Sequence, residues 1–385
     1  DAPASSQALQ FGDNTDGMSL FPLSADRAVM AVNNEYTNVE YLYAHQGKAI
    51  TADDVLKAQN AHGVSIFEIK KSSTGWVVDR SGQRNRRITA NTPMQLTGPA
   101  AGDALLKTAA DETGTDVLGT FNNCANGQTP WGTYLTCEEN FHKYFGSNDD
   151  TYTVPAAQQR YGIKGADKTY QWSKHDSRFD LSKNPNEPNR HGWVVEIDPM
   201  DPNSKPKKRT ALGRFKHENA ALMVDGSGHV VVYLGDDERG EHLYKFVSKD
   251  KYIANNAVHN RNLLDEGTLY VAKFMAVDGE LKGQGQWLEL TFGKNGLTPE
   301  NGFNSQAEVL IHTRLAATQV GATTMDRPEW VAVHPNKQTA FCTLTNNKNR
   351  GKKDNQPVSG PNPRANNVYG QIVRWAPAQG DHTRS

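Results

Sequence analysis

The stretch ENAALMVDGSGHVVVYLGDD, residues 218–237, has the form of a β-hairpin. A short apolar run after Glu218 leads to the turn pair Asp225-Gly226, and the β-branched run 230–234 returns from it. The same design recurs as EWVAVHPNKQTAFCTLTNN at residues 329–347, and the first acidic residue and the closing polar residue are 18 positions apart in both copies. This repetition predicts a supersecondary unit that occurs more than once.

Two weaker copies precede these hairpins. One runs from Asp16 to Glu35, and the other runs from Asn122 to Asn140. Each copy has an acid or an amide at both open ends. Radial repetition of such units builds a β-propeller, in which the polar ends converge on one mouth of the central channel. The alternative is that polar residues flank strands here as they do in any β protein.

The rest of the chain favours an all-β fold with a few short helices. Short β-branched runs bounded by turn residues recur throughout, whereas helical periodicity is limited to residues 51–61 and 102–113. Residues 147–190 and 348–367 are rich in Pro, Asn, Lys and Gly, so we expect long inserted surface loops there. We also expect the basic run Lys205 to Arg209 to be solvated.

Composition excludes several classes of protein. The 385 residues include 42 Lys and Arg against 43 Asp and Glu, a net charge of −1, so we expect no nucleic acid as a partner. No apolar stretch approaches the roughly 18 residues of a membrane helix. Three cysteines, Cys124, Cys137 and Cys342, exclude a disulfide framework but leave a Cys124 to Cys137 bridge open. Nucleotide-binding glycine loops and the Gly-x-Ser-x-Gly motif of hydrolases are absent from the sequence.

The converging hairpin ends supply a set of metal-ligand side chains. They are Cys137, Glu138, Glu218, Asp236 and Glu329, with the amides of Asn34, Asn122, Asn123 and Asn347 nearby. So many carboxylates require cations to neutralise them; oxygen ligands suit calcium, and a thiolate suits a transition metal. Arg327 lies two residues before Glu329, where a guanidinium could hold a phosphate group. The alternative for Arg327 is a structural ion pair.

Five motifs resemble the PhoX family of bacterial alkaline phosphatases. They are GTFNNCANGQTPWGTYLTCEEN at 119–140, FGDNTDGM at 11–18, VNNEY at 32–36, KHENAA at 216–221 and DRPEW at 326–330. The resemblance implies a six-bladed β-propeller that is exported folded by the twin-arginine route and is periplasmic or secreted. It also implies hydrolysis of phosphomonoesters at alkaline pH by two ferric ions and three calcium ions around a bridging oxide.

The resemblance also implies roles for individual residues. Cys137 and Glu218 would bind iron, Glu329 would help to hold the cluster, and Glu138 and Asp236 would bind calcium. Asn123 joins these metal ligands by its position in the repeat, and Arg327 would bind the phosphoryl group, so that Arg327 and Glu329 form the catalytic set. The partners would be small phosphomonoesters and phosphate, and the protein would be a monomer.

Members of that family are longer than this chain. We therefore expect residues 1–385 to form a single β-propeller domain that is incomplete at the C-terminus and lacks its last blades. This leaves open a truncated inactive fragment, a calcium-stabilised propeller that binds a partner without catalysis, and a calcium lactonase on a similar propeller.

Overall fold

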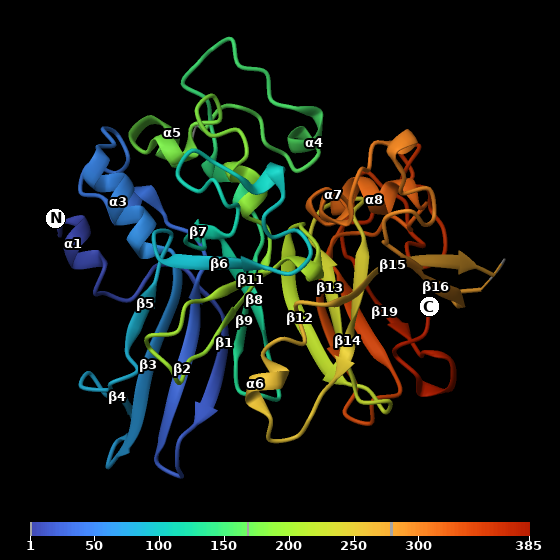
Figure 1. The fold of residues 1–385 in the computed structure, drawn as a ribbon, viewed down its shortest axis with the longest axis horizontal. Coiled ribbons are helices and arrows are strands. Elements are labelled where there is room, and N and C mark those ends of the chain that lie inside the picture. The colour runs from blue at the N-terminus through green and yellow to red at the C-terminus, as the bar shows by residue number, and fades with distance from the viewer. Residues whose placement is uncertain (1, 168, 278–279) are drawn as a thin grey trace. The chain divides into compact units, whose positions relative to one another are not determined.

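The computed structural model describes residues 2–167, 169–277 and 280–385, and its fold is mainly β (Figure 1). The chain forms two compact units. Unit 1 comprises residues 1–96 and 101–208, and unit 2 comprises residues 97–100 and 209–385. None of the described helices has the length and hydrophobicity needed to cross a membrane.

Unit 1 is built on two β-sheets. The first has the order β1-β2-β3-β4, with β5 also paired to β3, and the second has the order β7-β6-β11-β10-β9-β8. The strands are β1 (Thr15–Pro22), β2 (Arg27–Asn34), β3 (Gly63–Ser72), β4 (Gly75–Val78), β5 (Arg86–Ile88), β6 (Pro93–Thr97), β7 (Asp116–Leu118), β8 (Asn123–Gln128), β9 (Tyr134–Glu138), β10 (Val194–Ile197) and β11 (Lys207–Arg209).

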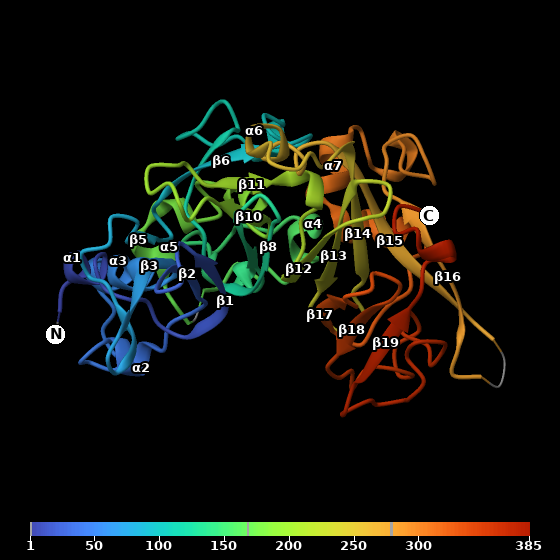
Figure 2. The ribbon, with the colours of Figure 1, turned by 90° about the horizontal axis from the view of Figure 1, so that it is seen from below.

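Unit 2 contains a five-stranded sheet of order β12-β13-β14-β15-β16 and a three-stranded sheet of order β17-β18-β19. Figure 2 shows the three strands of the smaller sheet side by side, coloured from dark orange to red. The strands are β12 (His217–Val224), β13 (His229–Asp236), β14 (Leu243–Lys251), β15 (Gly267–Ala276), β16 (Gly283–Glu289), β17 (Pro328–Val333), β18 (Ala340–Leu344) and β19 (Gln371–Trp375).

The helices among the described residues are short. The α-helices are α1 (Ala4–Gln7), α2 (Val39–Leu42), α3 (Ala52–Ala61), α4 (Ala156–Gln159), α5 (Trp172–His175), α6 (Ala257–Asn260), α7 (Gln306–Ile311) and α8 (Thr313–Gln319). The 3-10 helices are η1 (Ala104–Leu106), η2 (Phe141–Tyr144), η3 (Ser177–Phe179), η4 (Glu187–Arg190), η5 (Thr210–Leu212), η6 (Pro299–Asn301) and η7 (Ala378–Gly380).

One of the two predicted helices is confirmed. Helix α3 begins with a capping box, in which Thr51 and Asp54 satisfy each other's backbone N–H groups. The helix predicted at 102–113 is wrong, because that segment contains only η1. There the Asp111 carboxylate accepts hydrogen bonds from the backbone of Thr113, Gly114 and Asp116, which stabilises a turn in place of a helix.

Burial along the strands explains their places in the sheets. Strand β1 alternates, with Gly17, Ser19 and Phe21 buried and the residues between them exposed, as expected of a strand with one solvent-facing side. Strand β13 is buried at nearly every residue and lies between β12 and β14. In unit 2, a core of apolar side chains that includes Tyr233 and Cys342 packs against these strands.

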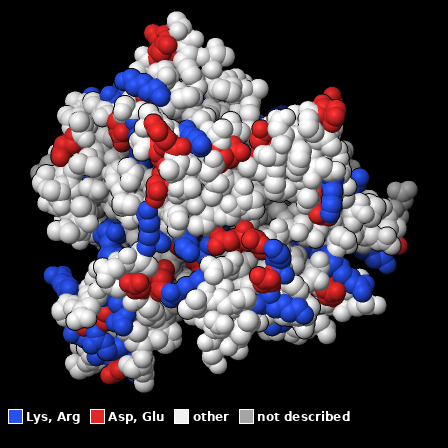
Figure 3. All heavy atoms as spheres, in the orientation of Figure 1, with Lys and Arg blue, Asp and Glu red and all other residues white. Residues whose placement is uncertain are grey.

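Two segments that the sequence placed at the surface are partly buried. Within the described part of 147–190, the loops bury a set of aromatic and aliphatic side chains, namely Val154, Tyr161, Ile163, Tyr170, Trp172, Phe179 and Leu181. In the basic run, Lys208 and Arg209 are buried, because β11 pairs with β10 inside the second sheet. Over the face drawn in Figure 3, Lys and Arg side chains are interspersed with Asp and Glu, in keeping with the near-zero net charge.

Candidate functional site

All four predicted hairpins are present, and each has a β-bulge near the start of its first strand. The register shifts lie between Thr15 and Met18 in β1, Asn123 and Asn126 in β8, His217 and Ala220 in β12, and Pro328 and Val331 in β17. A bulge inserts a residue and redirects side chains. The first residue inside each bulge is Asp16, Cys124, Glu218 or Glu329, so each hairpin places a side chain of metal-ligand type at the same backbone position.

A backbone hydrogen bond closes each bulged end in the same way. The N–H of the residue after the second strand donates to the carbonyl two residues before the bulge residue: Glu35 to Asn14 and Glu139 to Asn122 at 2.9 Å, Asp237 to Lys216 at 3.0 Å, and Thr345 to Arg327 at 3.2 Å. Asn14, Asn122 and Arg327 have φ angles of 43°, 52° and 60°, which residues with a side chain seldom adopt. Such strained residues cluster at functional sites.

In unit 1, three side chains from the ends of these hairpins lie close together. Ligand atoms of Asp16, Glu35 and Cys124 all lie within 4.8 Å of one another, and Cys124 Sγ lies 3.7 Å from Asp16 Oδ2. A Glu139 carboxylate oxygen also lies within 4.8 Å of Cys124 Sγ. These residues come from the bulges of β1 and β8 and from the ends of β2 and β9.

The electrostatics of this cluster favour a bound cation. Burial, followed by the neighbouring charge of Asp16, raises the pKa of Glu35 to about 7, and burial also raises the pKa of Asp16. Two carboxyl groups that are hard to ionise side by side become good ligands when a metal ion supplies the opposite charge. Two carboxylates and a thiol form a mixed hard and soft donor set, so the residues present fit a transition metal together with calcium.

The structure favours Cys124 over Cys137 as the thiol ligand. Cys137 is fully buried in β9, where it pairs with Val194, and it is in neither of the groups of His, Cys, Asp and Glu that are close enough to hold a metal ion among the described residues. All three cysteines are free thiols, so the Cys124 to Cys137 bridge that the sequence left open is not formed. Cys342 is buried core, as predicted.

Glu138 is held by protein donors in place of the predicted calcium. Its Oε1 accepts hydrogen bonds from Lys208 Nζ at 2.7 Å and Thr120 Oγ1 at 2.8 Å, and its Oε2 accepts from the N–H groups of Gly192 and Trp193. Burial acts to raise the pKa of Glu138, but the charge of Lys208, together with the neighbouring His191, outweighs it and lowers this pKa to about 2. These four donors occupy the carboxylate lone pairs that a calcium ion would need.

Asp236 is likewise engaged within unit 2. Arg314 Nε donates to its Oδ2 at 2.8 Å and Arg314 Nη2 donates to its Oδ1 at 2.5 Å, while the Lys216 N–H also reaches Oδ1. Bidentate pairing with a buried arginine satisfies this carboxylate. The structure thus gives Asp236 an ion pair where the sequence suggested calcium binding.

Asn123, which the sequence predicted as a metal ligand, has a side-chain oxygen that no hydrogen-bond donor in the described part of the chain satisfies. Its side chain is fully buried and its Nδ2 donates to Thr120 Oγ1 at 2.7 Å, but its Oδ1 has no hydrogen-bond partner among the described residues. A buried amide oxygen without a donor is costly by about 1–3 kcal/mol. A calcium ion is one ligand that would satisfy it.

In unit 2, Arg327 and Glu329 lie together. Arg327 Nε and Nη2 donate to the two oxygens of Asp237 at 2.8 and 2.6 Å, and Nη2 also lies 3.2 Å from Glu329 Oε1. The ion pair that the sequence left open is therefore present, and it fixes the plane of the guanidinium. Glu218 is buried at the equivalent bulge of β12.

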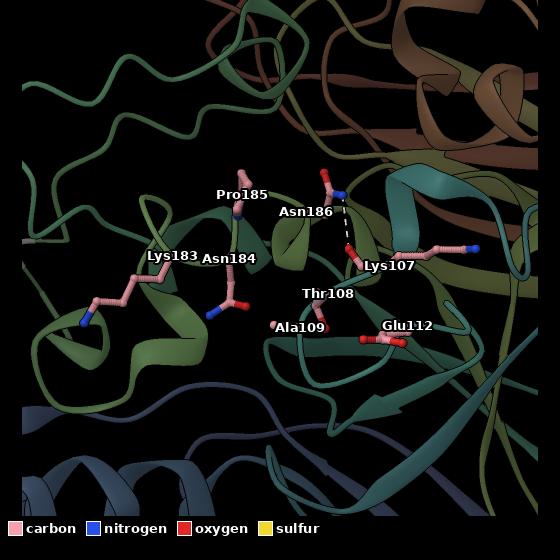
Figure 4. A pocket seen from close by; sticks show the side chains of 8 residues that line it. All are labelled: Lys107, Thr108, Ala109, Glu112, Lys183, Asn184, Pro185 and Asn186. Carbon is pink, nitrogen blue, oxygen red and sulfur yellow. Dashed lines mark hydrogen bonds between the residues drawn. The ribbon is translucent and has the colours of Figure 1, made fainter.

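A separate pocket in unit 1 contains none of these residues. It has a volume of about 300 Å³ and is lined by Lys107, Thr108, Ala109, Glu112 and residues 183–186, with a hydrogen bond from Asn186 Nδ2 to the Lys107 carbonyl across it (Figure 4). The candidate site is thus carried by the bulged hairpin ends.

The comparisons with known proteins identify the family of the chain. The family model described as alkaline phosphatase PhoX matches residues 1–385. The chain belongs to the PhoX family. It is an alkaline phosphatase, a hydrolase of phosphomonoesters, and the resemblance noted in its motifs is confirmed.

A solved PhoX structure extends this comparison. Pseudomonas fluorescens PhoX in complex with vanadate, a transition state analogue, is 58% identical with a TM-score of 0.97, over 100% of this chain and 67% of that chain. The family 117 glycoside hydrolase Zg3597 of Zobellia galactanivorans matches at 9% identity and a TM-score of 0.25, over 95% of this chain and 88% of that chain, which carries no argument. No curated protein matches the chain.

Proposed function

We propose that this PhoX-family chain hydrolyses phosphomonoesters with iron and calcium ions held at its bulged hairpin ends, two ferric and three calcium ions with a bridging oxide. The observation that carries the proposal is the group of Asp16, Glu35 and Cys124 in unit 1, in which Asp16 and Cys124 occupy equivalent bulge positions. A thiol beside two carboxylates suits iron, and carboxylate and amide oxygens such as Asn123 Oδ1 suit calcium.

Glu218 and Glu329 are proposed metal ligands of unit 2, because they occupy the same bulge position as Asp16 and Cys124. Metal ions of this kind, when bound, neutralise phosphoryl oxygens and supply a reactive oxygen nucleophile. The protein's part is to fix the ligands by backbone geometry, so that they need not reorganise during the reaction.

Arg327 is the proposed phosphoryl-binding residue. Its guanidinium is oriented by Asp237 and carries a fixed positive charge, which suits the tetrahedral oxyanion of a phosphate ester or of its product. The vanadate complex of the Pseudomonas fluorescens protein supports an anion site of this kind. Contact with the phosphoryl group more than with the alcohol predicts broad substrate tolerance.

For the fold, we propose that each bulged hairpin begins one blade of a β-propeller. The repeated register shift and the repeated closing hydrogen bond support this proposal. Residues 1–385 would form a single domain of that propeller, monomeric, with a periplasmic or secreted location. Cell fractionation of the source organism and light scattering of the purified chain test the last two points.

Elemental analysis together with an activity assay tests the proposed function. Purified chain is assayed with p-nitrophenyl phosphate at alkaline pH, and its iron and calcium are measured. Iron with calcium and hydrolysis are expected. Calcium without iron, and no hydrolysis, would support the non-catalytic scaffold in place of the proposed metal chemistry, and hydrolysis without either metal would refute the metal centre.

The two metals are expected to differ in how readily a chelator removes them. A calcium chelator is expected to abolish activity, added calcium to restore it, and iron to remain bound throughout, because carboxylate-held calcium exchanges faster than a thiolate-held ferric ion. Activity that persists after complete removal of calcium would show that calcium is not needed for catalysis.

A further inference from the structure

The Asn123 side chain is oriented by a buried hydrogen-bond chain that starts at Lys208. Lys208 Nζ donates to Glu138 Oε1 at 2.7 Å, and Thr120 Oγ1 donates to the same oxygen at 2.8 Å. Thr120 Oγ1 then accepts from Asn123 Nδ2 at 2.7 Å. All four side chains are fully buried, and all belong to unit 1.

The donor and acceptor roles in this series of hydrogen bonds follow from the protonation state of Lys208. Lys208 also reaches the Arg190 carbonyl and His191 Nδ1, so its three N–H bonds all have acceptors in a site without water contact. It is therefore a protonated amine opposite an ionised Glu138, which can only accept. The single Thr120 proton must point to Glu138, and the Thr120 lone pairs must accept from a neighbour.

This leaves one orientation for the Asn123 amide. Its NH₂ group must face Thr120, because an amide oxygen there would meet a hydroxyl oxygen with no proton to share. Its Oδ1 then faces away from Thr120, and this is the atom that has no partner. Asn123 directly precedes Cys124, and it pairs with Glu138, which directly precedes Glu139. The orphaned oxygen thus belongs to the strand ends that carry the candidate ligands.

We propose that Thr120, held by Glu138 and Lys208, is a positioning residue that presents Asn123 Oδ1 as a ready-made calcium ligand. This inference rests on the proposed calcium content of the site. The orientation is fixed before calcium arrives, so calcium binding does not have to reorder the amide. Glu138 then acts on the metal through Thr120 and Asn123 and does not touch it.

Calcium titration of chelator-treated protein tests the proposal, with affinities measured by calorimetry. Thr120→Val keeps the shape of the side chain and removes the hydroxyl, so its weakest calcium site is expected to bind about 10 to 100 times less tightly than in the parent. Thr120→Ser keeps the hydroxyl and should bind as the parent does. Thr133→Val is the matched control, because Thr133 is also buried and donates to a buried carboxylate, Glu196, at 2.5 Å. It should leave calcium affinity unchanged.

A double-mutant cycle with Asn123→Asp separates orientation from general damage. The two oxygens of an aspartate are equivalent, so Thr120 has no amide orientation to fix. Thr120→Val should then cost calcium affinity in the Asn123 background and little in the Asn123→Asp background. Equal losses in both backgrounds, or no loss in either, would overturn the positioning role. If Thr120→Val does not fold, as seen by circular dichroism, the cycle is run with Thr120→Ala.

The same titration distinguishes the two proposals. A parent that binds no calcium and is active without it refutes the proposed calcium centre and this inference with it. A parent that binds calcium, beside a Thr120→Val variant of equal affinity, refutes only the positioning role.

Discussion

Cys124 is the residue on which the proposed metal chemistry of this PhoX-family chain depends most. It is the only cysteine in the groups of potential ligands among the described residues, and it lies 3.7 Å from an Asp16 oxygen. Cys137 and Cys342 are buried in strands. The three thiols therefore offer an internal comparison.

Replacing Cys124 by serine is expected to remove iron and abolish phosphatase activity, because a neutral hydroxyl does not replace a thiolate as an iron ligand. Cys137→Ser and Cys342→Ser should keep iron and activity and lose only packing stability. Iron content and the visible absorption of ferric thiolate are the measurements. Loss of iron from Cys137→Ser with full retention in Cys124→Ser would restore the assignment first made from the sequence.

Arg327 allows a test of phosphate binding apart from metal binding. Arg327→Ala is expected to lower kcat/KM on the order of 10²-fold or more while metal content stays at the parent level, since a charge-assisted contact in the transition state is lost. Arg327→Lys keeps the charge but cannot pair with both Asp237 oxygens, so it should fall between parent and Ala.

Inhibition by inorganic phosphate provides the control for this variant. Arg327→Ala should be inhibited less strongly than the parent. If Arg327→Ala loses metal or unfolds while Arg327→Lys behaves like the parent, the residue is a structural counter-charge for Asp237 and Glu329.

The hairpins could be predicted from their sequences, but the bulges could not. Turn pairs such as Asp225-Gly226 and β-branched runs define strands locally, and the strands predicted from them are present. A bulge depends on which residue of the partner strand lies opposite, and the sequence alone does not show this. The hairpin of β8 and β9 was therefore aligned with the others by the end of its second strand. That alignment pointed to Cys137 and missed Cys124. A usable signal was present, because Asn14 and Asn122 each precede a bulge ligand by two residues, as Arg327 precedes Glu329.

The roles of Glu138 and Lys208 show a second limit. Lys208 lies in a run of basic residues that locally looks solvated, and its partner Glu138 is 70 residues away. Burial of both becomes evident only when β11, β10 and β9 are placed side by side in one sheet. The sequence therefore predicted Glu138 as a calcium ligand but could not show that its lone pairs are already occupied.

The turn before Thr120 is tightly packed, and Gly119 is its key residue. Its φ is 75°, and a Cβ atom there would lie 1.9 Å from the Ala90 carbonyl oxygen. Gly132 has a similar φ of 87° but open space around it. Gly132→Ala is expected to cost about 1 kcal/mol of unfolding free energy for its backbone conformation alone, and Gly119→Ala should cost clearly more, as measured by urea denaturation. Equal costs would show that the turn relaxes to accept a methyl group.

Global stability should depend on pH through Lys245 in unit 2. Its Nζ donates to the carbonyl oxygens of His382 and Arg384 and lies 4.9 Å from the Trp287 ring. Burial lowers the pKa of Lys245 to about 7, against the opposing effect of Asp381 and Asp225. The protein therefore buries this amine more easily when it is neutral.

The sign of the effect follows from the two pKa values. Between pH 7 and the unfolded-state pKa of 10.5, the unfolded chain holds the Lys245 proton and the folded chain releases it, so stability rises with pH. The slope from one such group is at most about 1.4 kcal/mol per pH unit. Thermal melts of the parent and of Lys245→Met across this window measure it. The difference between the two proteins should grow in the parent's favour with pH and level off below pH 7, and a constant difference would contradict the prediction.

The repeated bulge has a consequence for how the donor atoms of the proposed metal site could be exchanged. The four hairpins share the register shift and the closing hydrogen bond but carry Asp, Cys, Glu and Glu at the bulge. The backbone position is the same in all four hairpins, and the residue at that position determines which donor atom is presented. Exchanging Cys124 for Asp would therefore replace a soft donor by a hard one at the same backbone position, so the metal preference of the proposed site could be changed one hairpin at a time.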